Sequence, residues 1–209
     1  GVVLDALERT GLAASTDIVV MSDHGEDFGE HSDGVRGDPT RHGNGLFETQ
    51  LRVPLVIVSP SVDPGVRDEQ VSLVDLFPTV LAFAGLDAPA GTRGEALQVP
   101  GARAVAISEA LYPRYVEHQA KSARGSEGLK YVATLARPAR ESLHDVQRDP
   151  LEAADIASLR PQDVERLREA LLAALEGAPK PLAARAPGDP SQQLPESVLE
   201  SLRSLGYVE

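Results

Sequence analysis

The first hundred residues alternate between apolar positions at helical spacing and continuous apolar runs. At the start, Val3, Leu4 and Leu7 recur with the period of an amphipathic helix, and Gly11 stands just past its expected end. Residues 17–21 consist of Asp17 followed by a continuous apolar run, and polar residues stand on both sides of this segment. This pattern is typical of a strand buried on both faces of a parallel sheet. A helix followed by such a strand predicts an α/β fold.

A second strand and a second helix follow in turn. Residues 52–58 form another apolar run, with Pro54 near its start, where a strand tolerates proline. Residues 72–85 have the apolar density of a helix that covers a sheet, and they end on a glycine. Pro78 lies inside this segment, and we expect the regular helix to follow it.

The pattern changes after residue 101. Short apolar runs at 104–107 and 130–135 predict two strands, the stretch 137–155 is mainly charged, and residues 163–176 carry an apolar stripe of helical period. The residues of this stripe are Val164, Leu167, Leu171 and Ala174. Together these features predict a smaller α+β subdomain.

We therefore expect three parts in the chain. Residues 1–100 form part of an α/β domain, residues 101–178 the α+β subdomain, and residues 179–209 a linker with a C-terminal helix. Within the first part, residues 22–45 are rich in Asp, Glu, His and Gly and show no periodicity. They predict a long loop beyond the first strand, and long loops in such places are usually functional.

Three of the five histidines lie in this loop, at His24, His31 and His42, among many carboxylates. Carboxylates this close repel one another, and a bound cation relieves the repulsion by using them as ligands. Asp23 and His24 are the leading candidates because they directly follow the first strand, at the edge where α/β sheets bind ligands. Gly25 permits the sharp turn that brings both side chains to one site.

The same residues also have interpretations without chemistry. An Asp-His-Gly tripeptide alone is more often a turn or a helix cap than a metal site. His42 alone fits a surface or structural histidine, and the turn-like sequence after His31 predicts that His31 is exposed. His118 and His144 lie in charged stretches and are expected to be structural or surface residues.

Composition narrows the classes of partner and of chemistry. The 20 basic against 32 acidic residues give a formal charge of -12, which opposes binding to nucleic acid or to anionic lipid. The chain has no cysteine, so any metal site must use oxygen and imidazole ligands. No apolar run approaches the ~20 residues needed to cross a bilayer. Because the chain begins at Gly1 and not at a Met, the absence of a leader carries no information about the compartment, which stays open between periplasmic and cytoplasmic.

Two stretches of the sequence carry a recognisable motif: residues 17–31 read DIVVMSDHGEDFGEH, and residues 42–57 read HGNGLFETQLRVPLVI. Both stretches resemble the sulfatase family of the alkaline phosphatase superfamily. The resemblance extends outward to the segments 4–8, 71–79, 143–152 and 202–208. It therefore covers nearly the whole chain.

The resemblance implies a fold and a metal site. The fold is the C-terminal part of an alkaline-phosphatase-like sheet flanked by helices, with a small α+β C-terminal subdomain. The metal is a divalent ion, calcium by family resemblance, held by an early pair of aspartates and by a late pair that Asp23 and His24 match. The imidazole of His24 suits Mn or Zn better than calcium, which prefers oxygen ligands.

The resemblance also implies a nucleophile that this chain does not contain. Sulfatases use a formylglycine made from Cys or Ser in a Cys/Ser-x-Pro-x-Arg motif, upstream of the Asp-His-Gly strand, and no such motif occurs here. We therefore expect a C-terminal portion of the enzyme, with the formylglycine and the early aspartates in a missing N-terminal half. The chain alone should be inactive.

Substrate contacts fall to Arg41 and His42 by the same resemblance. Sulfatases commonly place a lysine near this segment, but no lysine precedes Lys121. His42 matches a His-Gly variant of the family and would act in catalysis by donating to the sulfuryl group or the leaving oxygen. The missing lysine keeps phosphate esters open as substrates beside small sulfate esters. Two alternatives therefore remain: a phosphodiesterase, phosphonate ester hydrolase or phosphoryl transferase, and a catalytically empty scaffold or binding module.

The sequence makes two geometric predictions about this site. Asp23 and His24 converge at the carboxyl end of the strand at 17–21. His42 faces the same edge, with its ring about 5 to 8 Å from the Asp23 carboxylate, as a shared anion site requires.

Overall fold

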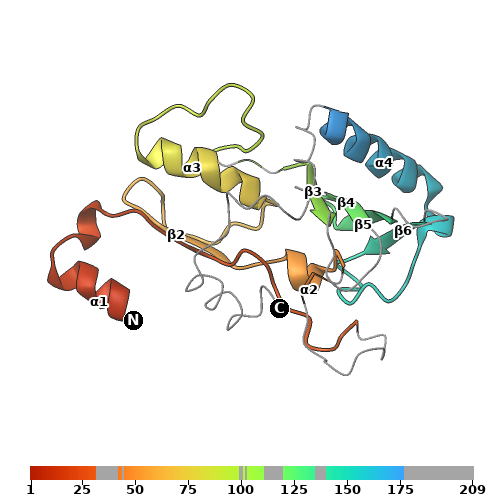
Figure 1. Ribbon diagram of the computed structural model, residues 1–209, viewed down its shortest axis with the longest axis horizontal. Coiled ribbons are helices and arrows are strands. Elements are labelled where there is room, and N and C mark those ends of the chain that lie inside the picture. Colours follow the sequence, from red (N-terminus) through yellow and green to blue (C-terminus); the bar gives the residue numbers. More distant parts are fainter. Residues whose placement is uncertain are drawn as a thin grey trace, which may run out of the picture. The chain divides into compact units, whose positions relative to one another are not determined.

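The computed structural model describes residues 1–31, 42–43, 45–98, 101, 103–110, 120–134 and 140–176 (Figure 1). The chain divides into two units, Gly1–Glu176 and Gly177–Glu209. The linker and helix expected at 179–209 lie outside the described residues, as does Arg41. All elements named below belong to the first unit, and the expected boundary between residues 100 and 101 stays a prediction.

The chain opens with helix α1, Val2–Arg9, as the apolar spacing predicts. The hydroxyl of Thr10 closes the helix by donating to the Ala6 carbonyl over 2.8 Å. Gly11 follows with a φ of 70°, a conformation that favours glycine. The helix has no buried residue, so its apolar side chains lie on the surface of the described chain.

Strands β1, Ile18–Met21, and β2, Leu55–Val58, form a two-stranded antiparallel sheet, and the short helix α2, Glu48–Leu51, directly precedes β2. Both strands lie where the sequence predicts them. The expected parallel pairing and burial on both faces are wrong for this chain, since Val20 and Val56 are 55% and 53% exposed. An apolar run predicts a strand and is more common in parallel sheets, but it does not fix the direction of the neighbouring strand.

Helix α3, Leu76–Phe83, follows a single 3-10 turn. Ser72 and Asp75 cap that turn reciprocally, because each side chain accepts the backbone N–H of the other residue. The helix begins two residues before Pro78, whereas we expected it to begin after this residue. Proline is tolerated there because the N–H groups of a first turn have no partner within the helix.

The later part of the described chain forms a four-stranded antiparallel sheet in the order β3-β4-β5-β6, with helix α4 along it (Figure 1). These elements are β3, Val105–Ala110; β4, Ala120–Gly125; β5, Leu129–Thr134; β6, Arg140–Asp145; and α4, Pro161–Glu176. A sheet covered by one helix agrees with the predicted α+β arrangement. Among the described helices, none has both the length and the apolar character needed to span a bilayer.

The core of this region lies between α4 and the sheet. The predicted stripe of α4 is buried at Val164, Leu167 and Leu171, and these side chains pack with Tyr131 and Leu143 from the sheet. The hydrophobic effect of this contact therefore holds α4 in place.

Candidate functional site

The loop after β1 is held against helix α2. The Gly25 N–H donates to the Gln50 carbonyl over 2.7 Å. A Cβ added at Gly25 would lie 2.0 Å from the Thr49 carbonyl oxygen, far inside contact distance. Gly25 does not have a positive φ, so glycine is needed for close approach to α2 and not for the sharp turn that we expected.

Asp23 and His24 lie next to each other at the end of β1. His24 Nδ1 is 2.7 Å from the Gly25 carbonyl oxygen, and a carbonyl only accepts, so Nδ1 donates in this contact. In the neutral ring, Nε2 then carries the lone pair, and it lies 3.8 Å from Asp23 Oδ1. A carbonyl contact of this kind is what commonly orients a metal-binding histidine.

His42, which lies later in the same loop, is in contact with His24. Its ring stacks on the His24 ring with centroids 4.0 Å apart and planes 24° apart. The neighbouring Gly43 N–H donates to Gln50 Oε1 over 2.9 Å. Gln50 therefore holds both the Gly25 backbone and the segment that carries His42. The predicted distance between His42 and the Asp23 carboxylate stays a prediction.

The donor atoms of Asp23 and His24 fit part of a metal site. Among the described residues, no group of three or more His, Asp or Glu side chains could hold a metal ion. The pair offers a carboxylate oxygen and an imidazole nitrogen, both accessible to solvent. Such a pair suits a divalent cation that takes nitrogen and oxygen ligands, with further ligands from elsewhere.

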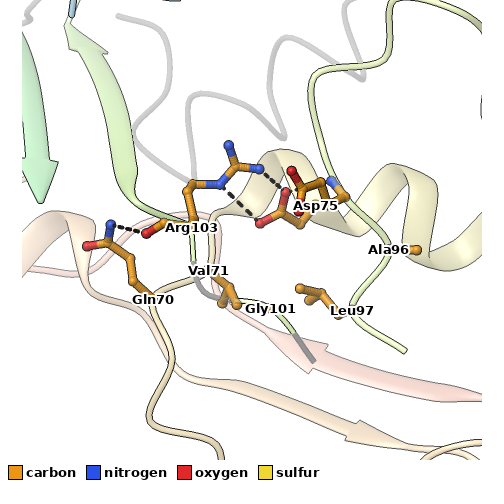
Figure 2. Close-up of a pocket in the computed structure, with 8 residues that line it drawn as sticks. Gln70, Val71, Asp75, Ala96, Leu97, Gly101 and Arg103 are labelled. Carbon is orange, nitrogen blue, oxygen red and sulfur yellow. Dashed lines mark hydrogen bonds and ion pairs between the residues drawn. The ribbon is translucent and has the colours of Figure 1, made fainter. Parts of the chain in front are cut away.

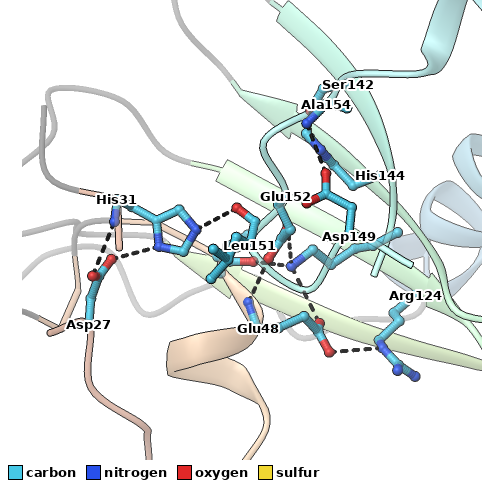
Figure 3. A network of polar contacts seen from close by, with 12 residues as sticks. Asp27, His31, Glu48, Arg124, Ser142, His144, Asp149, Leu151, Glu152 and Ala154 are labelled. Carbon is cyan, nitrogen blue, oxygen red and sulfur yellow. Dashed lines mark hydrogen bonds and ion pairs between the residues drawn. The ribbon is translucent and has the colours of Figure 1, made fainter. Parts of the chain in front are cut away.

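The side chain of His31 is only 9% exposed, in contrast to the exposed position that we predicted. Nδ1 lies 2.8 Å from Asp27 Oδ2, and Nε2 lies 2.9 Å from the Leu151 carbonyl oxygen (Figure 3). Both ring nitrogens of His31 therefore face acceptor atoms, a carboxylate and a carbonyl oxygen. The ring also stacks on Phe47 with centroids 3.7 Å apart. His31 therefore serves the structure by joining the loop to a distant turn.

Asp27 is the buried partner of His31. Burial by itself raises the pKa of a carboxyl group, because it disfavours the charged form. Hydrogen bonds from His31 and from the Gly29 N–H outweigh burial and lower the pKa of Asp27 below its ordinary value of 3.8. The Asp27 carboxylate therefore stays charged beside the His31 ring.

A buried lysine, Lys130, lies close to the contact between His31 and Leu151. Its Nζ is 2.6 Å from Glu152 Oε2, 2.7 Å from the Leu46 carbonyl oxygen and 3.4 Å from Glu48 Oε1. Glu152 Oε1 accepts the Glu48 N–H over 2.7 Å, and Glu48 also accepts from Arg124 Nε over 3.1 Å (Figure 3). Each charged group of this network thus has a partner of opposite charge.

One turn between β6 and α4 is linked, directly or through Lys130, to the residues that flank the segment 32–45. Leu151 binds His31 on the near side, and Glu152 binds Lys130, which in turn binds Leu46 on the far side. Glu152 has a φ of 52°, the only positive φ outside glycine among the described residues. Backbone in this region costs about 1 to 3 kcal/mol and persists where the surroundings fix it.

A cavity of about 300 Å³ lies beside the ion pair of Asp75 and Arg103 (Figure 2). The buried carboxylate of Asp75 also accepts the backbone N–H groups of Ser72 and Glu95 over 2.8 and 2.9 Å. Asp75 thus fixes the start of α3, and we assign this cavity no chemistry.

Sequence reasoning missed Glu26 and Asp27 as individual partners of the loop histidines. Glu26 Oε2 lies 3.2 Å from His42 Nδ1, and Asp27 binds His31. The sequence showed only that carboxylates and histidines share one loop, because nothing in the spacing assigns partners within an aperiodic segment.

Comparisons with known proteins bear on the family of this chain. The family model described as Sulfatase matches residues 1–86. The model described as N-sulphoglucosamine sulphohydrolase, C-terminal, matches residues 44–178, which is more than half of the chain. The chain belongs to the sulfatase family. The resemblance of its motifs to that family is therefore confirmed.

Curated relatives of this sulfatase chain are longer than the chain itself. Arylsulfatase K of Xenopus laevis is 30% identical over 185 residues, which are 82% of this chain and 33% of the relative. Choline-sulfatase of Rhizobium meliloti (strain 1021) is 31% identical over 163 residues, 75% of this chain and 30% of the relative. The chain thus spans about a third of the length of the relatives it matches.

Solved structures show the same fold. The structure of BT4656 in complex with its substrate D-glucosamine-2-N,6-O-disulfate has a TM-score of 0.70 at 24% identity, over 85% of this chain and 37% of that one. The phosphonate monoester hydrolase of Agrobacterium radiobacter has a TM-score of 0.65 at 24% identity, over 88% of this chain and 40% of that one. The predicted α/β fold with its α+β subdomain is confirmed by these likenesses.

Proposed function

We propose that this chain is the C-terminal portion of a metal-dependent sulfuric ester hydrolase, which converts a sulfate ester and water into an alcohol and sulfate. The main support is the convergence of three residues in a sulfatase chain. The Nε2 side of His24 lies beside the Asp23 carboxylate, and the His42 ring stacks on His24. A carboxylate, an imidazole and a second imidazole in contact are suited to bind a cation and an anionic ester together.

Asp23 and His24 are the residues that would hold the metal. When bound, a divalent cation would supply positive charge for the non-bridging oxygens of the ester. Calcium follows from the family resemblance, whereas the imidazole of His24 favours Mn or Zn. The bond from His24 Nδ1 to the Gly25 carbonyl keeps Nε2 available on the side of Asp23.

His42 is proposed as the catalytic group that contacts the ester, with Arg41 as a second donor for the anion. The ring of His42 is partly exposed, so it is accessible from solvent as a substrate contact must be. An imidazole at this place can donate a hydrogen bond to a sulfuryl oxygen or to the leaving oxygen.

The nucleophile is expected outside this chain. Neither cysteine nor a Ser-x-Pro-x-Arg motif occurs in the 209 residues. We propose that a formylglycine and an early pair of aspartates belong to an N-terminal half of the same protein, and that catalysis needs both parts.

The function is tested in the full-length parent with a chromogenic aryl sulfate. Because loss of a residue that merely supports a metal ligand costs about 10- to 100-fold, His24→Ala should lower kcat/KM more than about 100-fold. Asp23→Asn should have a similar effect, and both variants should lose bound metal after dialysis. Glu30→Ala, a change at an exposed residue of the same loop, should affect neither metal content nor rate.

A parent that retains its metal and its rate after both substitutions would contradict the metal assignment. A parent with metal but without turnover of any ester would identify the catalytically empty scaffold instead.

Phosphonate or phosphate ester hydrolysis is the second candidate. It is supported by the absence of lysine before Lys121 and by the fold shared with the Agrobacterium phosphonate monoester hydrolase. The ratio of kcat/KM for an aryl sulfate and the matching aryl phosphonate decides between the two functions. A ratio above one supports the sulfatase, and a ratio below one supports the phosphonate hydrolase.

A further inference from the structure

Glu26 lies two residues after His24 and reaches His42. Its Oε2 is 3.2 Å from His42 Nδ1. A carboxylate only accepts hydrogen bonds at neutral pH, so Nδ1 carries the hydrogen in this contact. Nε2 is then the ring nitrogen of His42 that remains for a substrate.

Stacking on His24 does not fix this orientation by itself. The two rings lie 4.0 Å apart with planes within 24° of each other, which restrains the tilt of the His42 ring. The torsion that rotates an imidazole within its own plane has two broad minima, related by a half-turn. The hydrogen bond to Glu26 favours one of these two orientations, because a half-turn would put a ring carbon, which cannot donate in the same way, in the place of Nδ1.

The second carboxylate oxygen of Glu26 lowers the stability of the folded loop. Oε1 is buried and has no hydrogen-bond partner among the residues that the structure describes. Leaving a buried acceptor unpaired costs about 1 to 3 kcal/mol, and more for a charged group. Glu26 therefore adds little to the stability of the loop. A buried acceptor that lacks a partner calls for an explanation other than stability.

We propose that Glu26 is a positioning residue for His42. Its carboxylate fixes the ring with Nδ1–H toward Glu26 and Nε2 toward the ester oxygens. The inference deepens the proposed function and rests on it for the identity of the substrate. The geometry itself rests only on the contacts of Glu26, His42 and His24.

Three variants of the full-length parent test the proposal. Glu26→Ala removes the acceptor and should lower kcat about 10- to 100-fold with little change in KM, as loss of a supporting partner does at other sites. Glu26→Gln keeps an oxygen that accepts from Nδ1, so it should restore most of the rate. Glu30→Ala is the matched control, because Glu30 is an exposed acid of the same loop whose carboxylate accepts the Phe28 N–H.

Thermal unfolding separates positioning from a structural role. The side chain of Glu26 is 34% exposed, so its truncation leaves no closed cavity and Tm should stay within a few degrees of the parent. Glu26→Ala should also have no further effect in a His42→Ala background, since the two residues act through one group. A fall in Tm that parallels the fall in rate, or additive effects of the two substitutions, would overturn the proposal.

A spectroscopic readout keeps this inference separate from the proposed function. In the parent labelled with ¹⁵N-histidine, the nitrogen shifts of His42 should report a protonated Nδ1, and Glu26→Ala should weaken that preference while Glu26→Gln preserves it. An inactive parent with these shifts would refute the function and leave the positioning contact standing. An active parent in which Glu26→Ala matches Glu30→Ala in rate and in shifts would refute the positioning role alone.

Discussion

At the scale of single residues, the histidines of the loop differ in what faces each ring nitrogen. Both nitrogens of His31 meet acceptors, Asp27 and the Leu151 carbonyl, within 2.9 Å. In His24, only Nδ1 is bonded to a carbonyl oxygen, and Nε2 lies on the side of the Asp23 carboxylate. A ring whose two nitrogens both contact protein atoms serves the structure, whereas a ring with one accessible nitrogen can bind a ligand.

The ion pair of His31 and Asp27 makes stability depend on pH. Because hydrogen bonds lower the pKa of Asp27 below 3.8, its stabilising effect is fully present above that pH and is lost as pH falls through the folded value. Asp27→Asn should therefore destabilise the parent by about 3 to 5 kcal/mol at pH 7, the cost of breaking a buried pair.

Denaturant unfolding at pH 7 and near pH 3 measures this effect. The difference between Asp27→Asn and the parent should shrink at the lower pH, where the parent carboxylate is itself becoming protonated. The exposed Asp17→Asn serves as control and should show little difference at either pH. A difference that is equal at both pH values would contradict the assignment.

The sequence predicts the candidate ligands Asp23 and His24 because they directly follow an apolar run. It does not predict that Glu26 faces His42 or that the side chain of His31 is only 9% exposed, since those contacts depend on how the loop folds against α2 and against the turn at Leu151. Partners distant in the chain leave no periodic signal.

At the scale of elements, β5, β6 and α4 are joined by one carboxylate. The Tyr131 hydroxyl of β5 donates to Glu141 of β6 over 2.6 Å, and Arg168 of α4 binds the same carboxylate over 2.6 Å. Burial, followed by the bond to Glu141, raises the pKa of Tyr131 from 10.0 to about 12. The bond from Arg168, with that from Tyr131, lowers the pKa of Glu141.

Tyr131 should therefore stabilise the sheet in its neutral form. A group with a raised pKa contributes stability below its unfolded value, here 10.0, and loses it as pH rises through about 12. Unfolding of Tyr131→Phe and of the parent, compared between pH 8 and pH 11, should show a difference that narrows at the higher pH. A difference that widens there would contradict the direction of the shift.

The elements also differ in how well the sequence predicts them. The apolar stripe of α4 predicts its buried residues, because a helix against a sheet must bury one face. Strand β4 escapes prediction, since Ala120–Gly125 consists of small and charged residues with low strand propensity. Ser122 and Ala123 are buried there only because neighbouring strands cover them.

At the scale of the whole molecule, β1, β2 and α1 carry several large apolar side chains that are exposed in the described chain. The exposed side chains include Val2, Val3, Val20, Val56 and Val58. This exposure supports our proposal that the chain is a portion of a longer parent protein.

Residues 1–209 expressed alone should therefore associate and should not turn over ester. We expect aggregates or oligomers in size-exclusion chromatography, and monomeric behaviour when the remainder of the parent is co-expressed. With Ca, Mn or Zn, the rate on aryl sulfate and aryl phosphonate should equal that of the same chain carrying His24→Ala. Metal-dependent turnover above that control would show that the chain holds a nucleophile of its own.

The turn at Leu151 and Glu152 fixes the chain on both sides of the loop segment 32–45. It anchors His31 and, through Lys130, Leu46, so both borders of the segment 32–45 are fixed from outside. Doubling the length of a loop between fixed ends costs only about 0.6 kcal/mol of closure entropy. Insertions or deletions within residues 32–40 should therefore cost little closure entropy and should leave His31 and Leu46 anchored. Arg41 and His42, the proposed substrate contacts, lie outside that stretch.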